Sequence, residues 1–184
     1  MDLDREIQRV AELAATRGEP GDAVSGVIPA EPTPGRRVYL CSFDDADGRR
    51  SWLAVHADGT PVTTRVELRE AVSIAALCEI AADAAGGGDV DALVERLAEI
   101  REVESPAGIE RAEEAALALR GILGDPPWLA TPERLDAIGT ASRRLEQELD
   151  PVAASPFTAA LRSAEVAVAE LQREIEAGYR APLS

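Results

Sequence analysis

Residues that could carry out chemistry are scarce in this sequence. The chain has one His (His56) and two Cys (Cys41 and Cys78), and it contains neither Lys nor Asn. A hydrolytic or transfer site needs a base that titrates near neutral pH, an activated nucleophile or several metal ligands. Carboxylates are abundant, but pairs such as Glu113 and Glu114 stand among Arg and Ala at the spacing of solvated helix surfaces. The sequence therefore predicts no catalytic residues and favours a role other than catalysis.

His56 and two arginines form the one combination that could bind a ligand. The segment 36–56 has four Arg and three Asp, whereas the whole chain has a formal charge of −15. In a hairpin that closes symmetrically about Ala46, His56 lies opposite Arg36, with Arg37 adjacent. This corner could hold an anion in a small-ligand-binding protein or a weak hydrolase with a pocket between the hairpin and the helices. The hypothesis requires the three side chains to converge on a concave site; the simpler interpretation is a half-exposed His at a strand end.

The rare residues do not predict a metal site. Zinc sites use three or four ligands, usually at paired spacings. Cys41, His56 and Cys78 show no paired spacing, and Cys41 and His56 would face opposite sides of the sheet. The glycines 86–88 precede Asp89 but follow a helical pattern, so they indicate a helix stop and not a phosphate cradle. We expect neither a metal nor a cofactor.

The acidic composition limits the partners and the compartment. Asp and Glu number 34 against 19 Arg, and a field of that sign repels phosphate backbones and anionic membrane surfaces. We expect no nucleic acid and no membrane as partner; the charge serves solubility or attracts a basic protein. The first residues lack an apolar signal region, and the longest nearly apolar run, 71–78, is too short to cross a bilayer. We therefore expect a cytoplasmic protein with reduced thiols, encoded by a GC-rich genome because Lys and Asn codons are A-rich.

The first third of the chain predicts a helix, a linker and a small sheet. Apolar spacing indicates an N-terminal helix within 1–17, and the Pro- and Gly-rich segment 18–35 is typical of a linker that tethers it. Two strand-like runs flank a turn cluster, and 61–63 adds a short third strand, so we expect an antiparallel meander over about 36–63. One face of the hairpin would carry Tyr39, Cys41, Phe43, Leu53 and Val55, and the other Val38, Leu40, Trp52 and Ala54.

The rest of the chain is predicted to be helical. Pro residues that follow Ser or Thr begin several of these helices. The last stripe alternates steps of four and three, as in a coiled-coil seam: Phe157, Leu161, Ala164, Val168, Leu171 and Ile175. The predicted fold is α+β and predominantly α, with the meander packed on a helical bundle. Residues 36–125 would hold the meander and its helices, 126–184 a C-terminal αα-hairpin, and 36–184 together one compact domain.

These features favour a non-enzymatic protein-interaction module, such as an adaptor, a regulator or a chaperone-like protein. A hairpin with two apolar faces needs a cover, and Trp52 and Tyr39 are candidates for an exposed interaction surface, although a Trp in a hairpin is more often part of the core. The C-terminal seam could form a homodimer, and the tethered N-terminal helix could dock in cis or in trans. An auxiliary domain whose activity belongs to a neighbouring protein is equally compatible with the sequence.

Overall fold

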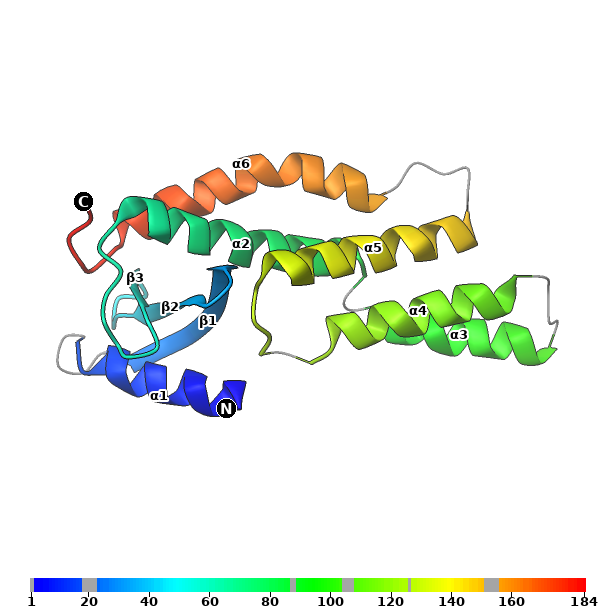
Figure 1. The fold of residues 1–184 in the computed structure, drawn as a ribbon, viewed down its shortest axis with the longest axis horizontal. Coiled ribbons are helices and arrows are strands. Elements are labelled where there is room, and N and C mark those ends of the chain that lie inside the picture. Colours follow the sequence, from blue (N-terminus) through cyan, green and yellow to red (C-terminus); the bar gives the residue numbers. More distant parts are fainter. Residues whose placement is uncertain (1, 18–22, 87–88, 104–107, 126, 151–155) are drawn as a thin grey trace. The chain divides into compact units, whose positions relative to one another are not determined.

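The computed structural model describes residues 2–17, 23–86, 89–103, 108–125, 127–150 and 156–184 (Figure 1). Its elements, in chain order, are α1 (Leu3–Ala15), β1 (Ala23–Thr33), β2 (Arg36–Asp44), β3 (Arg50–Val55), α2 (Arg65–Ala84), α3 (Val90–Val103), α4 (Ile109–Leu123), α5 (Pro132–Leu149) and α6 (Pro156–Ala177). The predicted class, α+β and predominantly helical with a small antiparallel sheet, is confirmed.

The chain divides into two compact units. The sheet unit comprises Met1–Ala76, Pro126–Pro132 and Val166–Ser184, and the helical unit comprises Leu77–Asp125 and Glu133–Glu165. The predicted ranges 36–125 and 126–184 are each divided between the two units. Each unit is therefore described on its own.

The sheet begins earlier than the sequence predicts. Residues 23–33, assigned above to a linker, form β1, which pairs antiparallel with β2 in the order β1-β2-β3. The linker prediction is wrong there because proline is tolerated in an edge strand, where one row of backbone groups has no neighbouring strand to pair with. Pro29 pairs with Tyr39, and Gly35 turns the chain with a positive φ of 78°. Residues 18–22 of the predicted linker lie outside the described residues.

The β2–β3 hairpin has the predicted faces with a different pairing. Tyr39 pairs with Val55 and Cys41 with Leu53, so the hairpin closes about Asp47 and not about Ala46. This shift moves each partner by two residues, which leaves every side chain on its predicted face because strand side chains alternate. His56 lies beyond the last pair and is not opposite Arg36. The predicted strand 61–63 is reduced to an isolated bridge between Pro61 and Val55.

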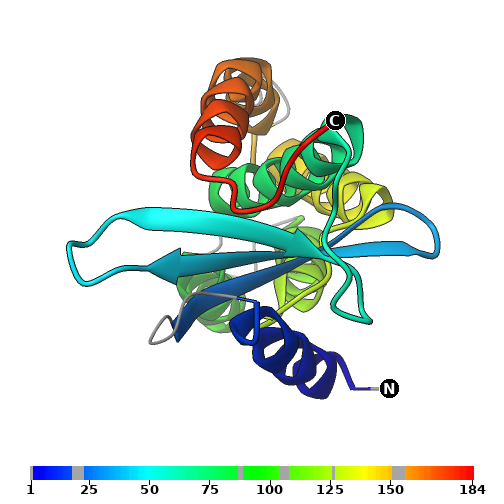
Figure 2. The same ribbon diagram turned by 90° about the vertical axis from the view of Figure 1, so that its left-hand side faces the viewer.

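The N-terminal helix docks in cis on one face of the sheet (Figure 2). Val10 and Ala14 of α1 are fully buried against the sheet residues Tyr39, Cys41, Phe43, Leu53 and Val55. The other face, with Val38, Leu40, Trp52 and Ala54, is buried as well. The first part of α2 lies on that side in Figure 2.

A charged cluster fixes α1 to the sheet. The Arg37 guanidinium donates to the Glu6 carboxylate at 2.7 Å and to Glu31 at 3.1 Å. Glu6 belongs to α1 and is only 6% exposed, so the ion pair with Arg37 compensates for the loss of water around its carboxylate. The Gly35 amide and the Arg37 guanidinium lower the pKa of Glu31. The cluster thus joins α1, β1 and β2 through a single arginine.

The outer edge of β3 is covered by the segment that follows α6. The Trp52 amide donates to the Gly178 carbonyl at 2.9 Å, and the Arg180 amide donates to the Trp52 carbonyl at 2.9 Å. The Tyr179 hydroxyl accepts from the Ala54 amide and donates to the Val62 carbonyl at 2.8 Å. The Arg180 guanidinium lies 4.1 Å above the Phe43 ring. These contacts close an edge that would otherwise expose unpaired backbone groups.

Small residues share the interior of the helical unit with larger apolar side chains. Ala112, Ala115, Ala116 and Leu119 are the buried face of α4. Gly139 of α5 lies against the buried Phe157 ring, where an added Cβ would come within 3.2 Å of a ring carbon. Across the chain, the apolar seam predicted for the last helix is largely buried, with Phe157, Ala164, Val168 and Ile175 at most 8% exposed. This seam is therefore occupied within the chain.

Replacing Arg37 with Ala should weaken the docking of α1. The change leaves the Glu6 carboxylate buried without its cation, which we expect to cost about 1–3 kcal/mol of unfolding free energy. Urea unfolding measures this loss, and limited proteolysis within α1 should accelerate in parallel. Arg50→Ala is the control, because it breaks only the solvent-exposed pair with Asp44, and it should leave stability essentially unchanged. Equal effects of the two variants would contradict the role of the cluster.

Stability should fall steeply in alkali. Burial raises the pKa of Tyr39, Tyr179 and Cys41 to about 12. In the unfolded chain the same tyrosine and cysteine side chains have lower, ordinary pKa values, so they lose their protons before those of the folded chain do. Their contribution to the free energy of unfolding is therefore complete below pH ~9 and is lost as the pH rises from ~9 to ~12. Ultraviolet absorbance of tyrosinate should therefore appear together with unfolding measured by circular dichroism. A tyrosine that titrates near pH ~10 while the fold stays intact would contradict the burial argument.

Candidate functional site

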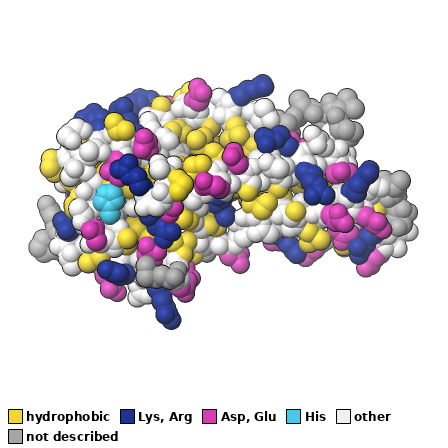
Figure 3. Space-filling model, viewed as in Figure 1, with side chains coloured by type: hydrophobic (Ala, Val, Ile, Leu, Met, Phe, Trp, Pro, Cys, Tyr) yellow, Lys and Arg dark blue, Asp and Glu magenta, His cyan; other side chains and the backbone are white. Residues whose placement is uncertain are grey.

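Among the described residues, we consider two surface depressions that could hold a ligand or a partner, one in each unit. The first, called the turn depression, is an opening of about 440 Å³ lined by Gly35, Arg36, Arg37, His56, Ala57, Asp58 and Glu67. The structure thus brings the three predicted ligand-binding residues, Arg36, Arg37 and His56, to one place. The single His is cyan in Figure 3 and lies at the surface next to basic side chains.

The cations of the turn depression are paired with carboxylates of the chain itself. Glu67, at the start of α2, lies 3.3 Å from the Arg36 guanidinium and 3.8 Å from Nε2 of His56. Arg37 is held by Glu6 and Glu31. Arg36 and His56 therefore converge on Glu67 and not on an empty position, and this carboxylate stands where a bound anion would have to be. The Thr60 amide lowers the pKa of Asp58, a further carboxylate at the rim.

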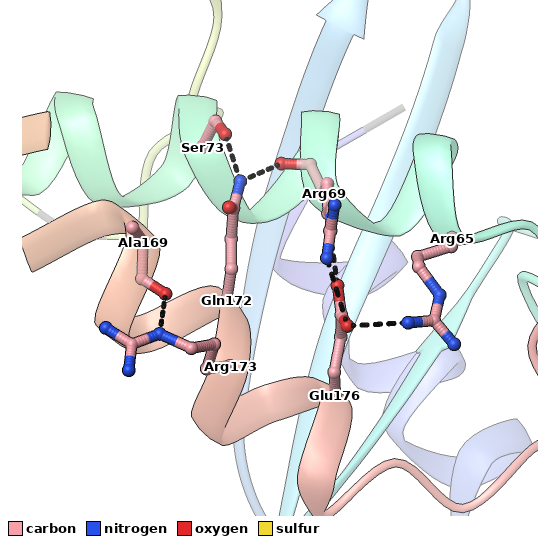
Figure 4. A network of polar contacts seen from close by, with 7 residues as sticks. All are labelled: Arg65, Arg69, Ser73, Ala169, Gln172, Arg173 and Glu176. Carbon is pink, nitrogen blue, oxygen red and sulfur yellow. Dashed lines mark hydrogen bonds and ion pairs between the residues drawn. The ribbon is translucent and has the colours of Figure 1, made fainter. Parts of the chain in front are cut away.

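A second charged cluster, between α2 and α6, is also paired within the chain. In Figure 4 the Glu176 carboxylate of α6 points toward Arg65 and Arg69 of α2, with which it forms ion pairs. The Gln172 amide donates to the Ser73 hydroxyl at 2.8 Å and to the Arg69 carbonyl at 3.2 Å. These contacts join the two helices within the sheet unit, and Arg69 and Arg65 lower the pKa of Glu176.

Trp52 and Tyr39 do not form an exposed interaction surface. Trp52 is 8% exposed and Tyr39 is fully buried. The prediction is wrong because both faces of the sheet are covered by the chain itself. The Tyr39 hydroxyl lies in the charged cluster beside Glu6 and Arg37, without a hydrogen bond of good geometry to either.

Cys41 and Cys78 are both buried, and they are not joined by a disulfide. Burial alone raises the pKa of the Cys41 thiol to about 12, so this thiol is a poor nucleophile at neutral pH. The residues that the structure describes contain no group of three or more His, Cys, Asp or Glu side chains arranged to hold a metal ion. Within the same residues, no helix combines the length and the apolar character needed to cross a bilayer.

The second depression, called the α4–α5 groove, lies in the helical unit. It has a volume of about 560 Å³ and is lined by Ala115, Ala118, Ile122, Glu133, Asp136, Ala137, Thr140, Ala141 and Arg144. The α4 residues recur at i, i+3 and i+7, and the α5 residues at i, i+3, i+4, i+7, i+8 and i+11, so each set lies on one helix face. Figure 3 shows apolar side chains among charged ones over these two helices.

The groove forms because α4 and α5 lie side by side and several of the side chains between them are alanines. Arg111 lies 3.2 Å from Glu148, and Arg144 lies 3.8 Å from Glu114, so α4 and α5 run antiparallel. Ala115 and Ala141 are buried and form the floor, whereas Ala118 is exposed on the wall. Alanine lets helix axes approach closely but fills little of the surface between them, which leaves an apolar channel.

The sequence analysis missed this groove. Ala115 and Ala118 in α4, and Ala137 and Ala141 in α5, share the helical spacing that identifies a face. That signal was present, but Ala is as common on buried faces as on exposed ones, and the antiparallel pairing of the two helices could not be deduced from it. Comparisons with protein families, with curated proteins and with solved structures found no match to this chain.

Glu67→Gln should turn the depression into an anion site. Removal of the carboxylate leaves Arg36 and His56 without their shared partner, so inorganic phosphate should bind in the variant, in the millimolar range, and not in the wild type. NMR shifts of the His56 ring and the Arg36 Nε–H during a phosphate titration measure this difference. Asp47→Asn, an exposed change in the β2–β3 turn, is the control. Saturable phosphate binding by the wild-type depression would contradict this interpretation and support an anionic ligand.

Proposed function

We propose that this chain is a non-enzymatic protein-interaction module that binds a helical segment of another protein in the α4–α5 groove. The observation that carries the proposal is the open, Ala-lined channel between two antiparallel helices. Helix-in-groove recognition uses such surfaces: the apolar face of an incoming helix places anchors at i, i+3 or i+4 and i+7 along the channel. An adaptor, a regulator or a chaperone-like role would each use this contact.

Several features support a heterologous partner over a second copy of this chain. The seam on α6 that favoured a homodimer in the sequence is mostly buried within the chain. The formal charge of −15 disfavours nucleic acid and favours a protein segment that carries basic residues. Two buried thiols that form no disulfide are compatible with a reducing compartment, so the proposal includes a role in the cytoplasm.

A small anionic ligand in the turn depression is the second candidate. It is favoured by the presence of Arg36, Arg37 and His56 around one opening, and opposed by the carboxylates that already pair with them. The phosphate titration of wild type and Glu67→Gln separates this candidate from the first.

Filling the groove should abolish partner binding without unfolding the protein. Ala118 is exposed on the groove wall, so Trp at this position can occupy the channel and exclude an incoming helix. Tagged wild type, Ala118→Trp and Ala92→Trp should be used for affinity purification from the native host, followed by mass spectrometry. Ala92 is an exposed alanine on α3 that does not line the groove.

We expect a stoichiometric partner with the wild type and with Ala92→Trp, and at least a tenfold loss with Ala118→Trp. Circular dichroism melts should be the same for all three proteins. A partner that Ala118→Trp retains in full would show that the groove is not the binding surface. Loss of the partner with both variants would show that the effect is not specific to the groove.

A further inference from the structure

The charges along the α4–α5 groove are only partly paired within the described part of the chain. Glu133 and Asp136 line one end, both exposed, and neither forms an ion pair with any other described residue. Arg144 lines the other end, where its contact with Glu114 is 3.8 Å long and both side chains are more than half exposed. The turn depression differs from this groove, because its cations are paired with nearby carboxylates. The groove therefore has the carboxylates of Glu133 and Asp136 at one end. At the other end it has the Arg144 guanidinium, which is largely exposed and makes only a long contact with Glu114.

The geometry points to a partner helix that is charged in a defined order: apolar along one face, basic at the end that meets Glu133 and Asp136, and acidic at the end that meets Arg144. This inference rests on the proposed function and specifies the partner of the same groove. Along α5, Glu133 and Arg144 are eleven residues apart, which is about 16 Å of helix. A partner segment of about three turns would match both ends.

The charges at the two ends of the partner helix also indicate its direction in the groove. Basic residues stabilise a helix at its C-terminus and acidic residues at its N-terminus. A partner with that arrangement places its C-terminal end beside Glu133 and Asp136 and runs antiparallel to α5. Because α4 runs antiparallel to α5, such a partner runs parallel to α4, so the dipoles of the two groove helices offset each other and the direction depends on the end charges.

Synthetic helices with identical apolar faces test the inference. One peptide carries Glu in its first turn and Arg in its last turn, and the second carries Glu at both ends. A side-chain lactam holds both peptides helical, so the comparison measures end charge and not helix content. Fluorescence anisotropy gives the Kd for the wild type and for three variants of the full chain: Ala118→Trp, Glu133→Arg/Asp136→Arg and Glu95→Arg/Glu99→Arg.

The variant Glu95→Arg/Glu99→Arg changes the net charge by the same amount, with both substitutions on exposed positions of α3. We expect the Glu/Arg peptide to bind the wild type about tenfold more tightly than the Glu/Glu peptide. Glu133→Arg/Asp136→Arg should invert this preference, while Glu95→Arg/Glu99→Arg should preserve it. Salt should reduce the preference, since the charges are exposed.

The outcomes separate the two claims. If both double variants change the preference equally, only net charge matters and the charge-order inference is overturned, while loss of binding in Ala118→Trp still supports the groove. If the two peptides bind the wild type equally, the charge-order inference is overturned as well. If neither peptide binds the wild type, or if Ala118→Trp binds as the wild type does, the groove itself is rejected.

Discussion

A small sheet with apolar side chains on both faces must be covered on both faces, and the sheet unit is organised around this requirement. Three strands alone cannot bury Tyr39 or Phe43 on one side and Leu40 or Trp52 on the other. The helix α1 covers the first group, and the first part of α2 lies on the second side. The edge of β3 is closed by the segment after α6. The elements that protect the sheet therefore come from the N-terminal helix, from the segment that follows β3 and from the segment that follows α6.

Polar contacts determine where these covers attach. An apolar face can slide on another apolar face at little cost, whereas a buried carboxylate must meet its cation. Arg37 gives Glu6 that partner and thereby fixes the register of α1 on the sheet. The ion pairs of Glu176 and the hydrogen bonds donated by the Gln172 side chain fix α6 against α2 in the same way. In both clusters the arginine side chains are paired with carboxylates of the same chain, so these cations are not free to bind an external anion.

The helical unit solves a different packing problem with different means. Its helices approach through alanine and glycine, as at Ala115 and Gly139, beside buried aliphatic side chains such as Ile138. Close approach buries backbone efficiently, but short side chains leave the outer seam between α4 and α5 unfilled. The feature that supports binding in this unit is thus a by-product of the residues that let its helices pack. Glu133 and Asp136 at one end of the groove form no ion pair with another described residue, in contrast to the carboxylates of the two clusters in the sheet unit.

The sequence by itself determined the helices, the two faces of the hairpin and the acidic surface, because these depend on local periodicity and composition. The predicted faces of the hairpin are correct although its pairing differs, because a displacement of two residues leaves each side chain on the same face, as for Tyr39 and Val55. Only the tertiary structure decided that 23–33 is a strand, because proline is compatible with a strand only when that strand lies at an edge. The burial of Trp52, the pairing of Arg36 with Glu67 and the groove at Ala118 also depend on segments that are distant in the sequence. Periodicity identifies the face on which a side chain lies, but the element that packs against that face is chosen by the complete fold.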